Sequence, residues 1–178
     1  FNEDTGPINV ELTGVTTGGG VDETGVQMLT VTATSSQPTL IPDPVVTGSG
    51  TAWTLAVDGA TDASGAATIT VIVTDDGGTA SGADVDALTQ TFTVIVSPVN
   101  DAPVFDDVAA VAVDEDSGIS TVSVTGISPG GGTDEASQSV IFTATSSDTT
   151  IVPNPSVSTS ADTGPVIYAP TGEANGTV

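Results

Sequence analysis

The chain has 178 residues and carries 23 Asp and Glu residues but no Lys, Arg, His or Cys, so its formal net charge is −23. These absences remove the His or Lys general base, the Cys nucleophile, the phosphate-binding Lys and every disulfide bond. Nucleic acids and anionic membrane surfaces are disfavoured as partners, because both are bound through cationic side chains. No apolar run approaches the roughly 20 residues that a membrane-spanning helix needs.

Short alternating segments follow one another along the chain. Hydrophobic residues make up 37% of the sequence, which is enough for a folded core. Apolar and polar residues alternate near residues 10–14, 29–33, 55–57, 69–73 and 92–96, and residues 108–113 form a further apolar run. A period of two indicates half-buried strands, and Gly, Pro, Asp and Asn punctuate them. We predict an all-β fold of tandem immunoglobulin-like (cadherin-like) antiparallel β-sandwiches, each of about seven strands and with almost no helix.

The sequence contains an internal repeat. Residues 2–6 (Asn-Glu-Asp-Thr-Gly) recur 112 positions later as residues 114–118 (Asp-Glu-Asp-Ser-Gly). After a one-residue deletion the offset becomes 111, and residues 32–36 match residues 143–147 without a difference (Thr-Ala-Thr-Ser-Ser). A period of about 111 residues is the size of one domain, so we predict two copies of one domain.

The two copies divide the chain at the period. Residues 1–102 form a repeat unit that lacks its first strand, and residues 103–178 form a second copy whose first strand lies at 104–113. The second copy stops before the counterpart of residues 68–97, which are the last two strands. We therefore expect the chain to be part of a longer protein, or of a filament in which neighbouring chains donate the missing strands.

Three motifs allow other interpretations. Residues 4–6 (Asp-Thr-Gly) and 116–118 (Asp-Ser-Gly) resemble the paired signature of aspartic proteases, but repetition alone accounts for the pair. A glycosidase carboxylate pair is disfavoured, because the acids lie in Gly-rich turns with few aromatic residues to stack on a sugar. Residues 175–177 (Asn-Gly-Thr) form an N-glycosylation sequon that the first copy lacks. We predict that the chain is not an enzyme.

Acidic groups gather in the sequence where one copy gives way to the next. Ca²⁺ takes six to eight oxygen ligands from carboxylates and carbonyls. Candidate ligands are Asp75, Asp76, Asn100, Asp101, Asp106, Asp107, Glu115 and Asp116. The alternative is that these groups are solvated turn residues. Because the chain has no cationic side chain, any bound cation must come from solution.

The joint between the copies resembles a known linker. Residues 97–105 (Ser-Pro-Val-Asn-Asp-Ala-Pro-Val-Phe) resemble the cadherin linker, and residues 73–77 (Val-Thr-Asp-Asp-Gly) resemble a cadherin segment upstream of it. The whole chain is similar to the cadherin-like and Ig-like tandem repeats of giant bacterial surface proteins and adhesins. The resemblance implies β-sandwiches in extracellular arrays with Ca²⁺ at the joints, and its ligand positions match Asp75, Asn100, Asp101 and Glu115. Pro98 replaces the leading linker Asp and no Asp-Arg-Glu segment exists, which favours one or two ions over three.

These observations together predict a function class. We expect a secreted or cell-surface structural or adhesive module that forms a stalk, fibre or sheath. Its partners would be neighbouring copies of the same repeat and other chains in a filament. The alternative is a glycan- or protein-binding module that acts through the loops at the sandwich ends.

Overall fold

The computed structural model describes residues 1–18, 27–77, 87–158 and 162–178, which form two compact units. The first unit comprises Phe1–Val99 with Gly132–Asp134, and the second comprises Asn100–Gly131 with Glu135–Val178. In these residues every sheet is antiparallel, and the one helical element is a 3-10 turn, η1 (Glu135–Ser137). The all-β prediction is confirmed. The described residues contain no helix of the length and apolarity that crossing a membrane requires.

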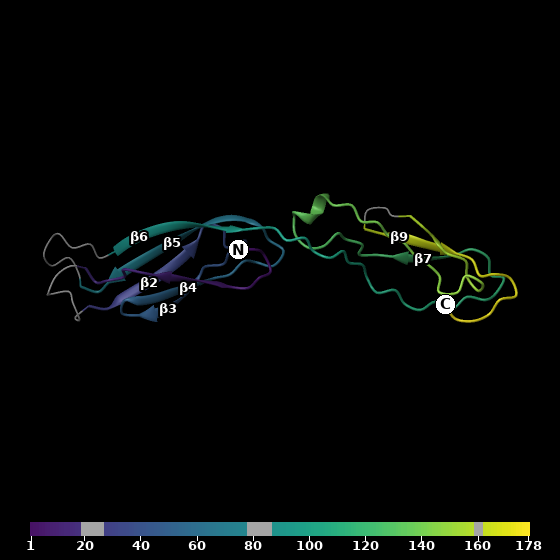
Figure 1. Cartoon of the computed structure of the whole chain (residues 1–178), viewed down its shortest axis with the longest axis horizontal. Helices are drawn as coiled ribbons and strands as arrows, with labels where there is room; N and C mark the ends of the chain where they lie inside the picture. Colours follow the sequence, from purple (N-terminus) through teal and green to yellow (C-terminus); the bar gives the residue numbers. More distant parts are fainter. Residues whose placement is uncertain (19–26, 78–86, 159–161) are drawn as a thin grey trace. The chain divides into compact units, whose positions relative to one another are not determined.

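The first unit contains two three-stranded sheets (Figure 1). One has the order β1-β4-β3, from β1 (Ile8–Leu12), β4 (Ala52–Val57) and β3 (Val45–Ser49). The other has the order β2-β5-β6, from β2 (Leu29–Ser35), β5 (Gly65–Asp75) and β6 (Ala87–Val96). Val, Ile and Thr dominate β5 and β6, and such β-branched residues favour the pleated conformation.

Both sheets contribute side chains to one aliphatic core. Ala67, Ile69 and Val71 alternate along β5 and are buried, whereas Thr68 between them is exposed. Leu55 of β4, from the other sheet, belongs to the same cluster. The complete buried cluster is Val15, Val31, Ala33, Ile41, Leu55, Val57, Ala67, Ile69, Val71, Val94 and Val96. Alternation along β2, β4, β5 and β6 therefore turns one face inward, as the sequence pattern indicated.

The second unit repeats the first sheet. It has the order β7-β9-β8, from β7 (Ser120–Val124), β9 (Gly164–Tyr168) and β8 (Ser156–Val157). The pair Ile8↔Val57 of the first unit returns as Ser120↔Tyr168. The pair Val45↔Ala56 returns as Ser156↔Ile167. Strand order and register are thus preserved at the offsets seen in the sequence.

The turns repeat as well. In the first unit the Ser35 amide donates to Asp43 Oδ1 at 2.7 Å, and in the second the Ser146 amide donates to Asn154 Oδ1 at 3.0 Å. Asp4 has a φ of 60° and its counterpart Asp116 a φ of 59°, a left-handed conformation that Asp tolerates better than most residues. The two Asp-Thr/Ser-Gly triplets are therefore equivalent turns, one in each unit.

The predicted first strand of the second copy, at residues 104–113, and the repeat counterpart of β2 are not strands in the described part of the chain. In residues 104–113 only Val104 forms a bridge, to Ser128, and Val108, Val111 and Val113 are exposed. Residues 140–146, the counterpart of β2, are also not a strand. An extended segment becomes a strand when a neighbour satisfies its backbone groups, and the described residues supply no sheet neighbour for either segment.

We predict that Ile69→Ala destabilises the first unit by about 2–5 kcal/mol, because it opens a cavity in a fully buried site. Ile95→Ala is the matched control, since Ile95 lies on the adjacent β6 and is 61% exposed. Trp53 is the one Trp of the chain and lies on β4 of the first unit, so its fluorescence during urea unfolding reports on that unit. An equal loss of unfolding free energy in Ile69→Ala and Ile95→Ala would contradict the assignment of Ile69 to the core.

Candidate functional site

Glu3 of the first unit has a buried carboxylate. Glu3 is 1% exposed, and its Oε1 accepts a hydrogen bond from the Val99 amide at 2.7 Å. Oε2 is buried and has no hydrogen-bond partner among the residues that the structure describes. The backbone holds Glu3 in place, because its amide donates to the Ser97 carbonyl at 3.0 Å just after the end of β6.

Further carboxylates belong to the same unit. Asp4 follows Glu3 directly, and its Oδ1 accepts a hydrogen bond from the Asp62 amide at 3.2 Å. Carboxylate oxygens of Asp4 and Asp62 lie within 4.8 Å of one another. Asp134 Oδ1 is buried, and no described residue forms a hydrogen bond with it. Among the described residues of the first unit, Glu3 and Asp134 therefore each have one buried oxygen without a partner, and the chain has no Lys, Arg or His to pair with them.

The second unit has a buried glutamate of its own. Glu135, on η1, is 1% exposed, and its Oε1 accepts a hydrogen bond from the Asp101 amide at 3.3 Å. Its Oε2 is buried and has no partner in the described part of the chain. Asn100 lies in the same region, where its Nδ2 donates to the Asp101 carbonyl at 2.7 Å and its Oδ1 accepts from Gln138 Nε2 at 3.1 Å.

These groups offer oxygen ligands and no other donor type. Burying an ionised carboxylate costs several kcal/mol unless a counter-charge or hydrogen bonds compensate it. In Glu3 and Glu135 one hydrogen bond to Oε1 compensates part of that cost, and Oε2 has no partner among the described residues. A donor set of carboxylates and carbonyls fits Ca²⁺, which requires hard oxygen ligands.

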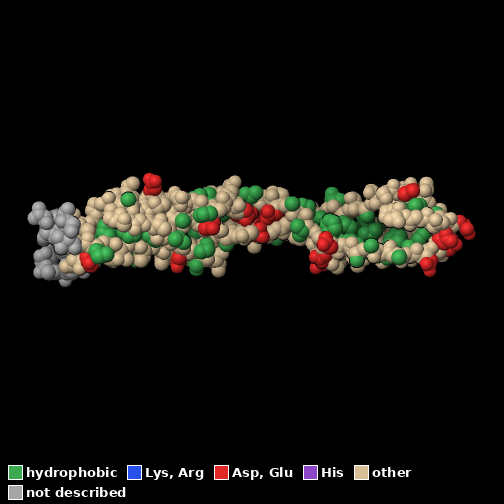
Figure 2. Space-filling model, turned by 90° about the horizontal axis from the view of Figure 1, so that it is seen from below, with side chains coloured by type: hydrophobic (Ala, Val, Ile, Leu, Met, Phe, Trp, Pro, Cys, Tyr) green, Lys and Arg blue, Asp and Glu red, His purple; other side chains and the backbone are tan. Residues whose placement is uncertain are grey.

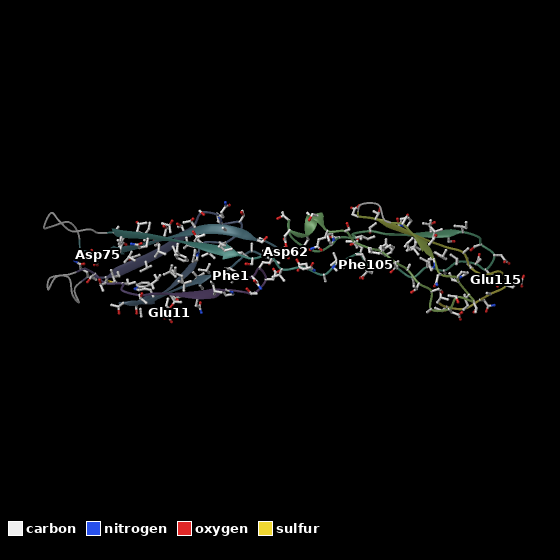
Figure 3. All side chains as sticks on the ribbon, turned by 45° about the horizontal axis from the view of Figure 1, so that its top comes forward. Phe1, Glu11, Asp62, Asp75, Phe105 and Glu115 are labelled. Carbon is white, nitrogen blue, oxygen red and sulfur yellow. The ribbon has the colours of Figure 1, made fainter. Side chains whose placement is uncertain are left out.

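Of the four ligands predicted from the sequence, the structure brings Asn100 and Asp101 together, and Glu135 joins them. Asp75 ends β5, where its Oδ1 accepts from the Gly77 amide at 3.0 Å. Figure 3 shows Asp75 and Asp62 at opposite ends of the first unit. Within the second unit it shows Glu115 at the opposite end from Phe105. As a ligand set, the four residues remain a prediction.

Sequence reasoning missed Glu3 and Glu135. The repeat contained a signal for Glu3, because the 112-residue offset makes it the counterpart of Glu115, which was chosen from the resemblance. Glu115 is exposed, whereas Glu3 is buried against the segment that follows β6. No sequence motif distinguished Glu135 from the other acids.

Comparisons with known proteins give two weak structural similarities. No family model matches the chain, and no curated protein matches it. One is to a structure of surface layer protein SbsC, domains 1–6, with 22% sequence identity and a TM-score of 0.29. The match spans 81% of this chain and 17% of the SbsC chain. The other is to a crystal structure of S-layer protein SbsC domains 4 and 5, with 21% sequence identity and a TM-score of 0.27. That match spans 98% of this chain and 68% of the SbsC chain. TM-scores this low do not establish a shared fold, and they assign no function to this chain.

We predict that Glu3→Gln stabilises the first unit in the presence of a chelator. Gln keeps the Oε1 acceptor for the Val99 amide but removes a buried charge that no protein cation compensates. The expected gain is about 1 kcal/mol, measured as a higher urea midpoint of Trp53 fluorescence. Glu11→Gln, on the exposed face of β1, is the control and should leave the midpoint unchanged. A lower midpoint for Glu3→Gln in chelator would contradict the interpretation.

Proposed function

We propose that the chain is a non-enzymatic structural element of a cell-surface or secreted protein, built from tandem Ig-like β-sandwich units and stabilised by Ca²⁺. The observation that carries the proposal is the preserved register of β1-β4-β3 and β7-β9-β8 at the 111–112 residue offset. A unit copied with its register and turns intact is typical of a repeat array, in which each copy serves as a spacer.

The strand orders of the first unit support an Ig-like sandwich. Constant-type Ig domains place strands B, E and D in one sheet and strands C, F and G in the other. If β1–β6 are read as strands B to G, then β1-β4-β3 and β2-β5-β6 reproduce both orders. Asn2 pairs in parallel with Ser97 just after β6, which adds a short contact near the end of the last strand. Leu55 of one sheet and Ile69 of the other belong to the same buried cluster, which fits two sheets packed face to face in a sandwich.

Calcium would compensate the buried acids of each unit. In the first unit Asp4 and Asp62, whose carboxylate oxygens lie within 4.8 Å of one another, would supply two ligands, and Glu3, next to Asp4 in the sequence, would add its buried Oε2. In the second unit Glu135, Asp101 and Asn100 would supply carboxylate and amide oxygens. Bound Ca²⁺ would supply positive charge near Glu3 and Glu135, whose Oε2 atoms have no partner among the described residues. Asp75 and Glu115, the remaining ligands predicted from the resemblance, could bind Ca²⁺ only at separate sites. Asp75 lies at the opposite end of the first unit from Asp62, and Glu115 lies at the opposite end of the second unit from Phe105. A folded unit that binds an ion is stabilised relative to the unfolded chain.

We predict that Ca²⁺ raises the urea midpoint reported by Trp53 at fixed ionic strength. An ion that binds only the folded form at a hundredfold excess over its Kd contributes about 2.7 kcal/mol. Glu3→Gln should lose most of this increase, because it removes a carboxylate oxygen with no other partner. The response is measured by titrating Ca²⁺ into chelator-treated protein.

Two controls separate specific binding from screening of the −23 charge. Na⁺ at matched ionic strength should reproduce none of the increase, and Glu11→Gln should respond to Ca²⁺ like the unmodified chain. If Na⁺ raises the midpoint equally, or if Glu3→Gln retains the full response, the calcium assignment is wrong and the acids are solvated turn residues.

We also predict a surface location. Antibodies raised against this chain should label intact cells of the source organism as strongly as permeabilised cells, measured by immunogold electron microscopy. Labelling that requires permeabilisation would contradict a surface or secreted role and would leave the calcium result unaffected. Proteolytic shaving with trypsin is unsuitable here, because the chain contains no Lys or Arg.

A further inference from the structure

The outer face of the β2-β5-β6 sheet is an array of threonines. Inward residues of the three strands, such as Val31, Ile69 and Val94, are buried, whereas their outward neighbours Thr32 and Thr93 are exposed. All three outward positions of β2 are Thr, as are three of the five on β5 and three of the five on β6, and the rest are Ala or Ile. We call this surface the threonine face; it comprises every second residue from Thr30 to Thr34, from Ala66 to Thr74 and from Ala87 to Ile95.

Strand pairing arranges these threonines in rows across the sheet. Thr34 pairs with Thr70 and Thr70 pairs with Thr91, so one row crosses all three strands. The pair of Thr68 with Thr93 lies in the next row. Figure 1 shows β2, β5 and β6 side by side. Because Thr is short and branched at Cβ, the face has no long side chain that keeps another surface at a distance.

The threonine face has no carboxylate, although the net charge of the chain is −23. The outer face of the other sheet differs, because Glu11 is exposed there on β1. Figure 2 shows Asp and Glu side chains on both units, and no Lys, Arg or His accompanies them. When two copies of this chain meet through surfaces that carry these acids, like charges oppose one another. Contact through the threonine face avoids that repulsion.

The hydroxyl groups also make this face complementary to itself. A hydroxyl can both donate and accept a hydrogen bond, whereas a carboxylate can only accept one. Thr74 Oγ1 donates to the Thr30 carbonyl at 3.4 Å, and the other hydroxyls of the face have no partner in the described part of the chain. Two identical threonine faces can therefore exchange hydrogen bonds while their methyl groups pack together.

The size of the face fits a weak contact. Its strands contain 7, 11 and 10 residues. At about 3.3 Å per residue and about 4.8 Å between strands, the face measures roughly 450 Å². Two copies would bury about 900 Å² together, which is the range of transient interfaces. The second unit has exposed Thr143 and Thr145 at the positions of Thr32 and Thr34, so part of the pattern recurs and an array can sum weak contacts.

We propose that the threonine face is a self-association surface, through which a second copy of this chain packs face to face on the β2-β5-β6 sheet. The contact is isologous, with the same residues on both copies, because an uncharged hydroxyl face complements itself. Each sheet keeps its own strands, so this contact requires no exchange of strands between chains. The proposal rests on the proposed structural function, since lateral contacts of this kind would join spacers into a fibre or sheath.

Sedimentation equilibrium of the 178-residue chain tests the proposal. In about 0.5 M NaCl, where the Debye length is roughly 4 Å, repulsion between the acids outside the face is screened. We expect a dimer with a Kd on the order of 1 mM, because the contact is in the weak class. Thr91→Glu should raise this Kd at least about tenfold, since it places like charges in the contact. Thr91→Ser should retain the dimer, because it keeps the hydroxyl.

Thr47→Glu is the matched control. Thr47 is an exposed Thr on β3, an edge strand of the other sheet, as Thr91 is on β6, and both substitutions add one negative charge. Thr47→Glu should leave the Kd unchanged, and the urea midpoint of Trp53 fluorescence should show that every variant is folded. A chain that stays monomeric at about 2 mM would overturn the proposal.

Two further outcomes of the comparison would also overturn the proposal. Equal weakening by Thr47→Glu and Thr91→Glu would assign the effect to general charge repulsion. Weakening by Thr47→Glu alone would assign the contact to the other sheet. A monomeric chain that still labels the cell surface would refute the threonine-face contact and leave the proposed structural function standing, so the two failures are distinguishable.

Discussion

Pairing of β5 with both of its neighbours is the interaction on which the first unit depends. β5 joins β2 on one edge and β6 on the other, and its alternate residues Ala67, Ile69 and Val71 fill the centre of the core. Val31 and Ala33 of β2 are buried in the same cluster. The described part of the second unit has the same first sheet but no strand in the position of β5, and its equivalent residues are half-buried or exposed. Residues with the same pattern are therefore buried where β5 lies beside them and half-buried where no described strand takes its position.

Charge is the second constraint on this chain. With 23 acids and no Lys, Arg or His, a carboxylate that becomes buried has no cationic side chain available to it. Glu3 and Glu135 are nevertheless 1% exposed, and each has one oxygen hydrogen-bonded to a backbone amide and one without a partner. A net charge of this size also opposes the compact state by self-repulsion. A divalent cation from solution would relieve both costs, and for that reason we connect the buried glutamates with calcium.

Local patterns predicted most of the strands but not all of them. Alternation located β2, β5 and β6, because a period of two is a property of neighbouring residues and survives in any sheet that has one buried face. The apolar run at residues 108–113 and the alternation at residues 140–146 did not give strands. These segments have suitable side chains, but whether they become strands depends on a partner distant in sequence, and the described residues provide none. The repeat likewise predicted a second sheet with the register of the first, because both copies have the same turns and apolar positions.

The paired glutamates Glu3 and Glu115 show where sequence information ends. The sequence alone determined the left-handed turn after each glutamate, since Asp4 and Asp116 have φ values of 60° and 59° in a shared motif. It also determined that no protein cation accompanies the acids, and that one domain pattern occurs twice. Only the tertiary structure decided that Glu3 is buried and Glu115 is exposed. The reason is that burial of Glu3 requires the segment after β6, whose Ser97 carbonyl and Val99 amide bind it from more than 90 residues away, and a motif of five residues contains no information about such a neighbour.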